Sequence, residues 1–456
     1  MQKLRQLGLL MIFWLITASS TSATQYNLPD LGSPGLVLYD KSMESELGRA
    51  FMTALHTDFT MIDDPFVVEY VRQIGSRLTS HLADGRQYHF FIIDRPEINA
   101  FAGPDGIIGI NRGLILAATS EDALASVIAH EIAHITQEHL SRRFEQFEQG
   151  NITSFASLLA AILIGTLDPS AGIATFIGGN SLAIQNQLRF SRIHEHEADS
   201  VGIKLLAQAG YNPRAMAQFF DQLHQQHNHS SRPPEVLLTH PVTERRTALA
   251  LARAEQQKTT QERYLDLKLI QARLTDQRIP LEQLNEKEHE AFHCYKNYLN
   301  LTNTPDNAAE IKSCLIQATK NQPGNRLLEI ALADIKDRSS NSVSNLLQLK
   351  DLYPQDNALA HQIAHQYQHR NDIGSAIAIL KHQATITPTK IELYQQISEL
   401  YLQKNDIANA LYFQALRANE IGNIRQFKHL LKEARKHASE TPTLLKKINN
   451  LLQENN

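Results

Sequence analysis

The stretch Ala129-His130-Glu131-Ile132-Ala133-His134 lies inside an apolar run from Ala123 to Ile135. On a helix, residues four apart lie on the same face, so His130 and His134 can hold one metal ion between their imidazoles. Glu131 projects about 100° away from His130 and can reach a water on that metal. This is the H-E-x-x-H arrangement of a zinc hydrolase, with two ligands and a general base in one helical turn.

The helix that carries this motif has a start signal. Thr119 can serve as its N-cap, and Glu121 and Asp122 place acidic side chains in the first turn. The alternative is a chance match among the 20 histidines of the chain. The motif is therefore a hypothesis that the rest of the chain must support with further ligands.

A candidate third ligand lies in His194-Glu195-His196-Glu197-Ala198-Asp199, which continues as a predicted helix to Gly210. Glu195 and Asp199 are four apart and share a face, whereas Glu197 points away from both. Glu195 would complete a site of two histidines and one glutamate, with a fourth position left for water. Asp199 can accept the free N–H of a zinc-bound histidine. Taken alone, the segment favours a solvated acidic face with two incidental histidines over a metal site.

A further histidine follows in Thr239-His240-Pro241. His240 can bind the metal at its open position or stabilise the oxyanion of a tetrahedral intermediate. If it binds the metal at rest, it holds the enzyme inactive until its loop moves. An ordinary loop histidine is the alternative. Arg246, a few residues on, receives no firm role.

Composition narrows the class of protein. At 456 residues, two or three domains are expected, and the formal net charge of −4 with dispersed Lys and Arg argues against nucleic-acid binding. Lys3 and Arg5 precede the apolar run 7–16, and small residues lead to Ala23. We predict a signal peptide over 1–23 and export to the periplasm, with an uncleaved anchor as the alternative.

The sequence before the motif predicts two helices within residues 43–82 and then a small sheet. Its strands are expected at 88–93, 99–102 and 107–110, with a turn at Gly103-Pro104-Asp105-Gly106. The exposed edge of such a sheet can take an extended peptide as an added strand across the metal. A structural hairpin without a substrate role is the alternative.

Residues 152–183 are apolar and small, interrupted by Asp168-Pro169-Ser170. Neither half is long enough to span a bilayer. A buried helix pair, a flap over the active site and a membrane-dipping segment all fit this pattern. The Gly and Ser content favours a flap or an interfacial segment, and hence peripheral membrane contact.

The C-terminal part contains an internal repeat. Asn371-Asp372-Ile373 recurs as Asn405-Asp406-Ile407, 34 residues on, and Ala376 meets Ala410 at the same offset. This is the tetratricopeptide period, in which stacked helix pairs leave a concave face for a peptide or partner. Cys294 and Cys314 lie on two consecutive predicted helices, and the sequence leaves a disulfide between them open.

Taken together, these motifs resemble the M48 family of zinc metallopeptidases over roughly residues 43–255. The resemblance rests on Asn99-Ala100-Phe101, Gly113-Leu114, His130-Glu131-x-x-His134, Glu195-x-x-Ala198-Asp199-x-x-Gly202 and His240-Pro241. It implies one Zn²⁺ per chain with His130, His134 and Glu195 as ligands, Glu131 as the base and Asp199 as the acid behind the ligands. The turn at 103–106 departs from the Gly-Gly pair of many members.

A signal peptide and C-terminal repeats further resemble a periplasmic branch of that family. This implies clients among unfolded or stalled outer-membrane β-barrel proteins, contact with the β-barrel assembly machinery through the repeats, and chaperone activity beside proteolysis. We predict a mainly α fold with a small β-sheet (an α+β zincin-type peptidase domain, 24–262) followed by an all-α tetratricopeptide-type solenoid (263–456). Two alternatives remain: a chaperone or scaffold with a structural or latched zinc centre, and a non-proteolytic zinc hydrolase.

Overall fold

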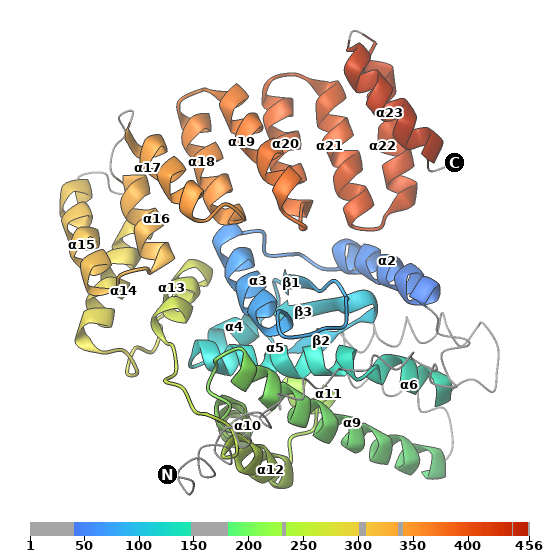
Figure 1. The fold of residues 1–456 in the computed structure, drawn as a ribbon, viewed down its shortest axis with the longest axis vertical. Coiled ribbons are helices and arrows are strands. Elements are labelled where there is room, and N and C mark those ends of the chain that lie inside the picture. The colour runs from blue at the N-terminus through green and yellow to red at the C-terminus, as the bar shows by residue number, and fades with distance from the viewer. Residues whose placement is uncertain are drawn as a thin grey trace, which may run out of the picture. The chain divides into compact units, whose positions relative to one another are not determined.

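A computed structural model describes residues 41–146, 181–229, 234–300, 307–335, 341–439 and 441–454. The predicted fold class is confirmed, because a small sheet lies among helices in the first half and the rest is helical (Figure 1). The expected signal peptide and all but the last three residues of 152–183 lie outside these ranges. Among the helices described, none combines the length and apolarity needed to cross a bilayer.

Two helices precede the sheet, as predicted. They are α2 (Lys41–Asp58) and α3 (Pro65–Thr79). The break between them comes from Asp64, whose carboxylate accepts hydrogen bonds from the backbone N–H groups of Phe66 and Val67, and from the proline in the first helical turn. A proline at that position loses no helical hydrogen bond.

The sheet has the strand order β1-β3-β2, with β1 (His89–Ile93) parallel and β2 (Ala100–Ala102) antiparallel to β3 (Ile107–Asn111). Successive side chains along each strand point to opposite faces of the sheet. Phe90 and Ile92 pack into the main core with α3, whereas their neighbours on the strand join a cluster with α2. Between β2 and β3 lies a 3₁₀ turn, η1 (Pro104–Gly106).

The motif helix is α5 (Glu121–Thr136), and it is buried from Glu121 to Ala133. A helix that is apolar all round lies inside a protein core. Its N-cap is Ser120 and not Thr119, because the Ser120 side chain accepts from the backbone N–H of Ala123. The other helices of this half are α4 (Arg112–Ala117), α6 (His139–Gln146), α9 (Ser181–Gln208), α10 (Ala215–His229), α11 (Glu235–Thr239) and α12 (Glu244–Ala254).

The remaining helices follow one another in the yellow to red part of Figure 1. They are α13 (Leu265–Leu274), α14 (Glu286–Leu299), α15 (Ala308–Asn321), α16 (Arg326–Ile335), α17 (Asn341–Leu352), α18 (Asn357–His369), α19 (Ile373–Ile386), α20 (Ile391–Gln403), α21 (Ile407–Glu420), α22 (Ile424–His437) and α23 (Pro442–Glu454). Cys294 on α14 and Cys314 on α15 form a disulfide. The domain boundary at 262/263 stays a prediction.

The 34-residue repeat has a structural counterpart. Asn371 and Asn405 both adopt a left-handed backbone with φ of 59°. The next residues, Asp372 and Asp406, each cap a helix by accepting from a backbone N–H three positions on. Asparagine tolerates the left-handed region better than most residues, so the two turns repeat the same geometry.

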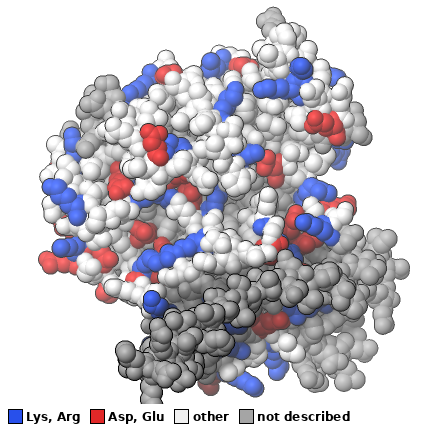
Figure 2. All heavy atoms as spheres, viewed as in Figure 1, with Lys and Arg blue, Asp and Glu red and all other residues white. Residues whose placement is uncertain are grey.

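On the face shown in Figure 2, the acidic and basic side chains of the described residues are interspersed, and they form no patch of a single sign there.

Candidate metal centre

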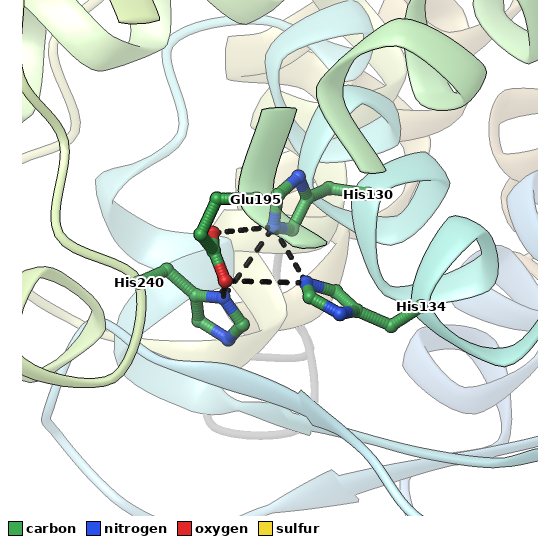
Figure 3. Close-up of side chains that lie close together, drawn as sticks. All are labelled: His130, His134, Glu195 and His240. Carbon is green, nitrogen blue, oxygen red and sulfur yellow. Dashed lines mark hydrogen bonds and ion pairs between the residues drawn. The ribbon is translucent and has the colours of Figure 1, made fainter. Parts of the chain in front are cut away.

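Two candidate ligands come from adjacent turns of α5. The Nε2 atoms of His130 and His134 lie 3.0 Å apart and face the same point (Figure 3). Two nitrogens bound to one tetrahedral zinc at 2.0–2.1 Å would be about 3.3 Å apart. The pair is therefore already close to the spacing that a metal ion requires.

The third candidate comes from α9, which packs along α5. Glu195 Oε2 lies 3.3 Å from His130 Nε2, and Glu195 Oε1 lies 3.6 Å from His134 Nε2. Gly202 explains the close packing, because a Cβ there would lie 3.3 Å from backbone atoms of Ala129. The small residue in the motif therefore lets α9 bring Glu195 to the two histidines.

His240 completes the cluster from the residue after α11. Its Nδ1 lies 3.0 Å and 3.1 Å from the two carboxylate oxygens of Glu195 and 3.4 Å from His130 Nε2. One donor atom from each of His130, His134, Glu195 and His240 lies within 4.8 Å of the others. The structure thus brings all three predicted ligands and His240 together, with Nδ1 as the His240 atom that faces them.

Glu131 borders this cluster but is not part of it. Its side chain is 1% exposed, and neither carboxylate oxygen has a hydrogen-bond partner among the described residues. The nearest basic atom is His240 Nε2, 3.7 Å from Oε1. A buried carboxylate is costly without a partner. A water held by a metal at the cluster would supply that partner, so the orphaned carboxylate and the His-His-Glu donor set fit a zinc ion.

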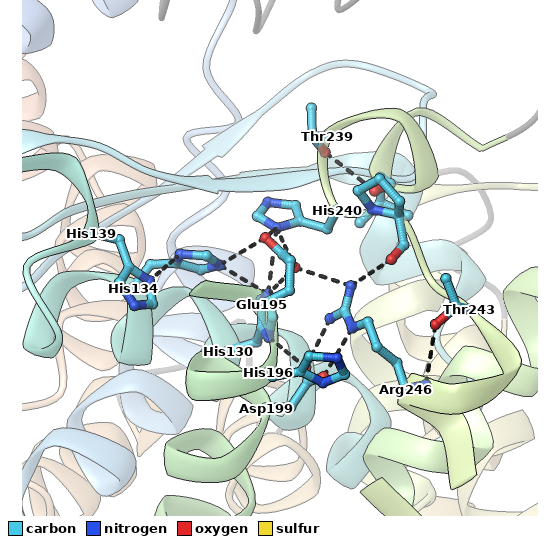
Figure 4. A network of polar contacts seen from close by, with 12 residues as sticks. His130, His134, His139, Glu195, His196, Asp199, Thr239, His240, Thr243 and Arg246 are labelled. Carbon is cyan, nitrogen blue, oxygen red and sulfur yellow. Dashed lines mark hydrogen bonds and ion pairs between the residues drawn. The ribbon is translucent and has the colours of Figure 1, made fainter. Parts of the chain in front are cut away.

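Asp199 lies behind His130, where the sequence predicts it. Its Oδ1 is 3.1 Å from His130 Nδ1. Arg246, for which the sequence predicts no firm role, donates from Nε and Nη2 to the two Asp199 oxygens at 2.9 Å and 2.8 Å (Figure 4). Its Nη1 lies 3.0 Å from Glu195 Oε2 and donates to the Pro241 carbonyl at 2.9 Å. One guanidinium thus connects Asp199, a ligand and the His240 loop.

His134 has an equivalent neighbour that the sequence analysis missed. The Nδ1 atoms of His134 and His139 lie 2.7 Å apart, and His139 Nε2 is 3.2 Å from Glu197 Oε2. Burial lowers the pKa of His139 to about 4. The only signal in the sequence was a histidine five residues after His134, at a spacing that no common motif contains.

Burial and neighbouring charges shift the pKa values of the candidate ligands in opposite directions. Burial opposes charge on His130, but its contacts with Asp199 and Glu195 outweigh burial and raise its pKa to about 10. Burial lowers the pKa of His134 well below its usual value. Burial also opposes charge on Glu195, but His240, His130 and His134 outweigh it and hold the pKa of Glu195 well below its usual range. Glu195 is therefore an anion within this cluster.

Two further features border the centre. A pocket beside Glu131 has a mainly apolar lining of Val127, Met216, Phe219, Phe220, Leu223, Val236 and Val242. β2 is an outer strand of the sheet, and its flanking residues Asn99 and Gly103 bond to Asn111 and Ile107 of β3. Because bonding alternates along antiparallel strands, the backbone groups of Ala100 and Ala102 point away from β3. Ala102 is partly exposed, whereas Ala100 is buried.

These elements define a metallopeptidase-type centre. Helix α5 carries two histidines and a glutamate, and helix α9 carries a second glutamate. Residues 68–254 match the model of peptidase family M48.

Similar proteins share this region. The chain is 37% identical over 230 residues to the beta-barrel assembly-enhancing protease of Escherichia coli (strain K12). The aligned region covers 50% of this chain and 47% of that protein. The chain is 39% identical over 230 residues to the putative beta-barrel assembly-enhancing protease of Vibrio cholerae, covering 50% and 48%. It is 29% identical over 223 residues to the mitochondrial metalloendopeptidase OMA1 of Danio rerio, covering 47% of each. The matches span about half the length of these relatives.

Proposed function

We propose that this protein is a zinc-dependent endopeptidase. The observation that carries the proposal is the convergence of His130, His134 and Glu195 beside the buried carboxylate of Glu131, which has no hydrogen-bond partner among the described residues. Three protein ligands with a fourth position left open distinguish catalytic zinc from structural zinc, which has four protein ligands. The family of residues 68–254 supports the same activity.

The residues around the metal centre would each have a separate role in peptide-bond hydrolysis. Bound zinc would polarise the scissile carbonyl and lower the pKa of its water. Glu131 accepts the proton of the attacking water and passes it to the leaving amine nitrogen. Asp199, 3.1 Å from Nδ1 of His130, would accept from that nitrogen in the metal-bound site, and Arg246 holds Asp199 and Glu195 in place.

The β2 edge supports a peptide substrate rather than a small molecule. The outward backbone groups of Ala102, which is partly exposed, can pair with an extended chain, whereas Ala100 is buried. Since α5 contacts β2, a strand added there would run past the metal helix. The apolar pocket beside Glu131 would then take a side chain next to the scissile bond.

The cellular role is proposed by analogy with the similar proteins. We place the protein in the periplasm, with unfolded or stalled outer-membrane β-barrel proteins as clients. The helical repeats, α18 to α21, would hold clients or contact the β-barrel assembly machinery. A chaperone role beside proteolysis belongs to the same proposal.

One observation favours a second candidate function. His240 Nδ1 already lies among the ligand atoms, so His240 can close the fourth position. A protein latched in this way would act chiefly as a chaperone or scaffold. The experiment is to test degradation and assembly of an outer-membrane barrel protein in cells that carry either Glu131→Gln or a deletion within residues 340–430. Loss of degradation with Glu131→Gln supports the peptidase, whereas a phenotype confined to the deletion supports the scaffold.

A further inference from the structure

Each candidate histidine ligand has a second ring nitrogen that needs a partner. Both present Nε2 to the cluster, which leaves Nδ1 of each ring facing outward. His130 Nδ1 faces a carboxylate, Asp199, as is common for metal-bound histidines. His134 Nδ1 instead faces another imidazole, His139 Nδ1, at 2.7 Å. The two ligands are therefore held by chemically different partners.

The contacts fix the proton positions along this chain. When Nε2 of His134 binds a metal, the neutral ring carries its proton on Nδ1. Nδ1 of His139 must then accept that proton's hydrogen bond, so the neutral His139 ring carries its own proton on Nε2. Nε2 lies 3.2 Å from Glu197 Oε2, a suitable acceptor. Every donor in the chain from His134 through His139 to Glu197 thus meets an acceptor.

Several contacts hold His139 in this orientation. Arg142, one turn on in α6, donates from Nη1 to the same Glu197 oxygen at 3.1 Å and from Nε to the Gln137 carbonyl at 2.8 Å. The His139 ring stacks on His194, with centroids 4.1 Å apart and planes 12° from parallel. His139 is 3% exposed. Such a side chain has little freedom to turn away from His134.

A neutral partner also suits the charge of the centre. Glu131, Glu195 and Asp199 already place three carboxylates around the ligands, with Arg246 as the balancing cation. A further carboxylate against His134 would add buried negative charge and its desolvation cost. An imidazole accepts the same hydrogen bond without adding charge.

We propose that His139 is a positioning residue, which fixes the ring of His134 as a metal ligand through the Nδ1 contact and is itself held by Glu197 and Arg142. This inference rests on the proposed metal centre. It does not depend on what the enzyme cleaves, so metal binding alone can test it.

The test compares three substitutions of His139. In His139→Asn the amide oxygen lies near the place of Nδ1 and can accept from His134, whereas His139→Phe keeps a ring against His194 without an acceptor. His139→Gln carries its amide further out, toward Glu197, and repeats the loss with a polar side chain should the Phe variant not fold. His56→Phe, a part-buried histidine on α2 that is not among the candidate ligands, is the matched control.

The readouts are the zinc dissociation constant, from competition with a chromogenic chelator, and the visible spectrum of the Co²⁺-loaded protein. We expect His139→Phe and His139→Gln to weaken zinc binding by about 10–100-fold and to alter the Co²⁺ bands, because loss of such an outer partner typically has this effect. His139→Asn should stay within about threefold of the unaltered protein, and His56→Phe should match it. Equal affinity in all variants would overturn the inference alone. Absence of zinc binding by the unaltered protein would overturn both the inference and the proposed function.

Discussion

Arg246 and Asp199 form a buried, bidentate ion pair. Nε and Nη2 of the guanidinium lie 2.9 Å and 2.8 Å from the two carboxylate oxygens. Arg246 is 3% exposed and also lies 3.0 Å from Glu195. Burial lowers the pKa of Arg246, but Asp199 and Glu195 outweigh burial and raise that pKa above its usual value. The guanidinium therefore neutralises two buried carboxylates, the candidate ligand Glu195 and Asp199 behind it.

Removal of this cation should destabilise the peptidase domain. In Arg246→Met, Asp199 and Glu195 would remain buried without their cation, at a cost of about 3–5 kcal/mol in the free energy of unfolding. Urea denaturation of the metal-free protein measures this change. Arg245→Met is the matched control, because Arg245 is exposed and its loss should leave the midpoint nearly unchanged. Similar midpoints for the two variants would contradict this role of Arg246.

Zinc binding should release protons and weaken as pH falls. With a pKa of about 10, His130 is protonated near neutral pH in the metal-free protein, whereas His134 is neutral and Glu195 ionised. Zinc must displace the His130 proton, so from about pH 9 to about pH 7 the affinity should fall about tenfold per pH unit. Calorimetry in buffers of different ionisation enthalpy should show release of about one proton. A pH-independent affinity would mean that His130 is not a ligand.

Substitution of His240 should raise peptidase activity. Its Nδ1 lies among the ligand atoms and 3.0 Å from Glu195, so His240→Ala would leave the fourth position to water. The measurement is the rate of casein cleavage at saturating zinc, with zinc content determined in parallel. A loss of rate at full zinc content would instead assign His240 to oxyanion stabilisation.

The disulfide should stabilise the helix pair α14 and α15. Cys294 and Cys314 are separated by 20 residues and join α14 to α15. Closing a loop of this length is worth about 3 kcal/mol in the chain-entropy model. Replacement of both cysteines by alanine should accelerate amide exchange in α14 and α15, and reductant should have no further effect on that variant. Unchanged exchange rates would show that packing alone holds the pair.

The sequence predicted those features that depend on local periodicity. The spacing of His130 and His134, the shared face of Glu195 and Asp199, and the 34-residue offset of Asn371 and Asn405 all follow from one helix or one repeat. The N-cap was misplaced by one residue because Thr119 and Ser120 can both cap, and only the backbone decides between them.

The contacts missed from the sequence join segments far apart in the chain. Arg246 meets Asp199 across 47 positions, and Glu197 meets His139 across 58. Neither pairing has a periodic signature, since each depends on how α9 packs against α5, α6 and α12. Glu197 does point away from Glu195 and Asp199, as predicted, but toward a histidine that holds His134.

The most direct test of the account is peptide cleavage by Glu131→Gln with zinc still bound. Glu131 lies beside the ligands without being one of them, so this change should leave zinc at one ion per chain. Loss of the general base should lower casein cleavage by about 10²–10⁴-fold. Cleavage at an unchanged rate by the zinc-loaded variant would contradict the assignment of Glu131 and, with it, the peptidase mechanism.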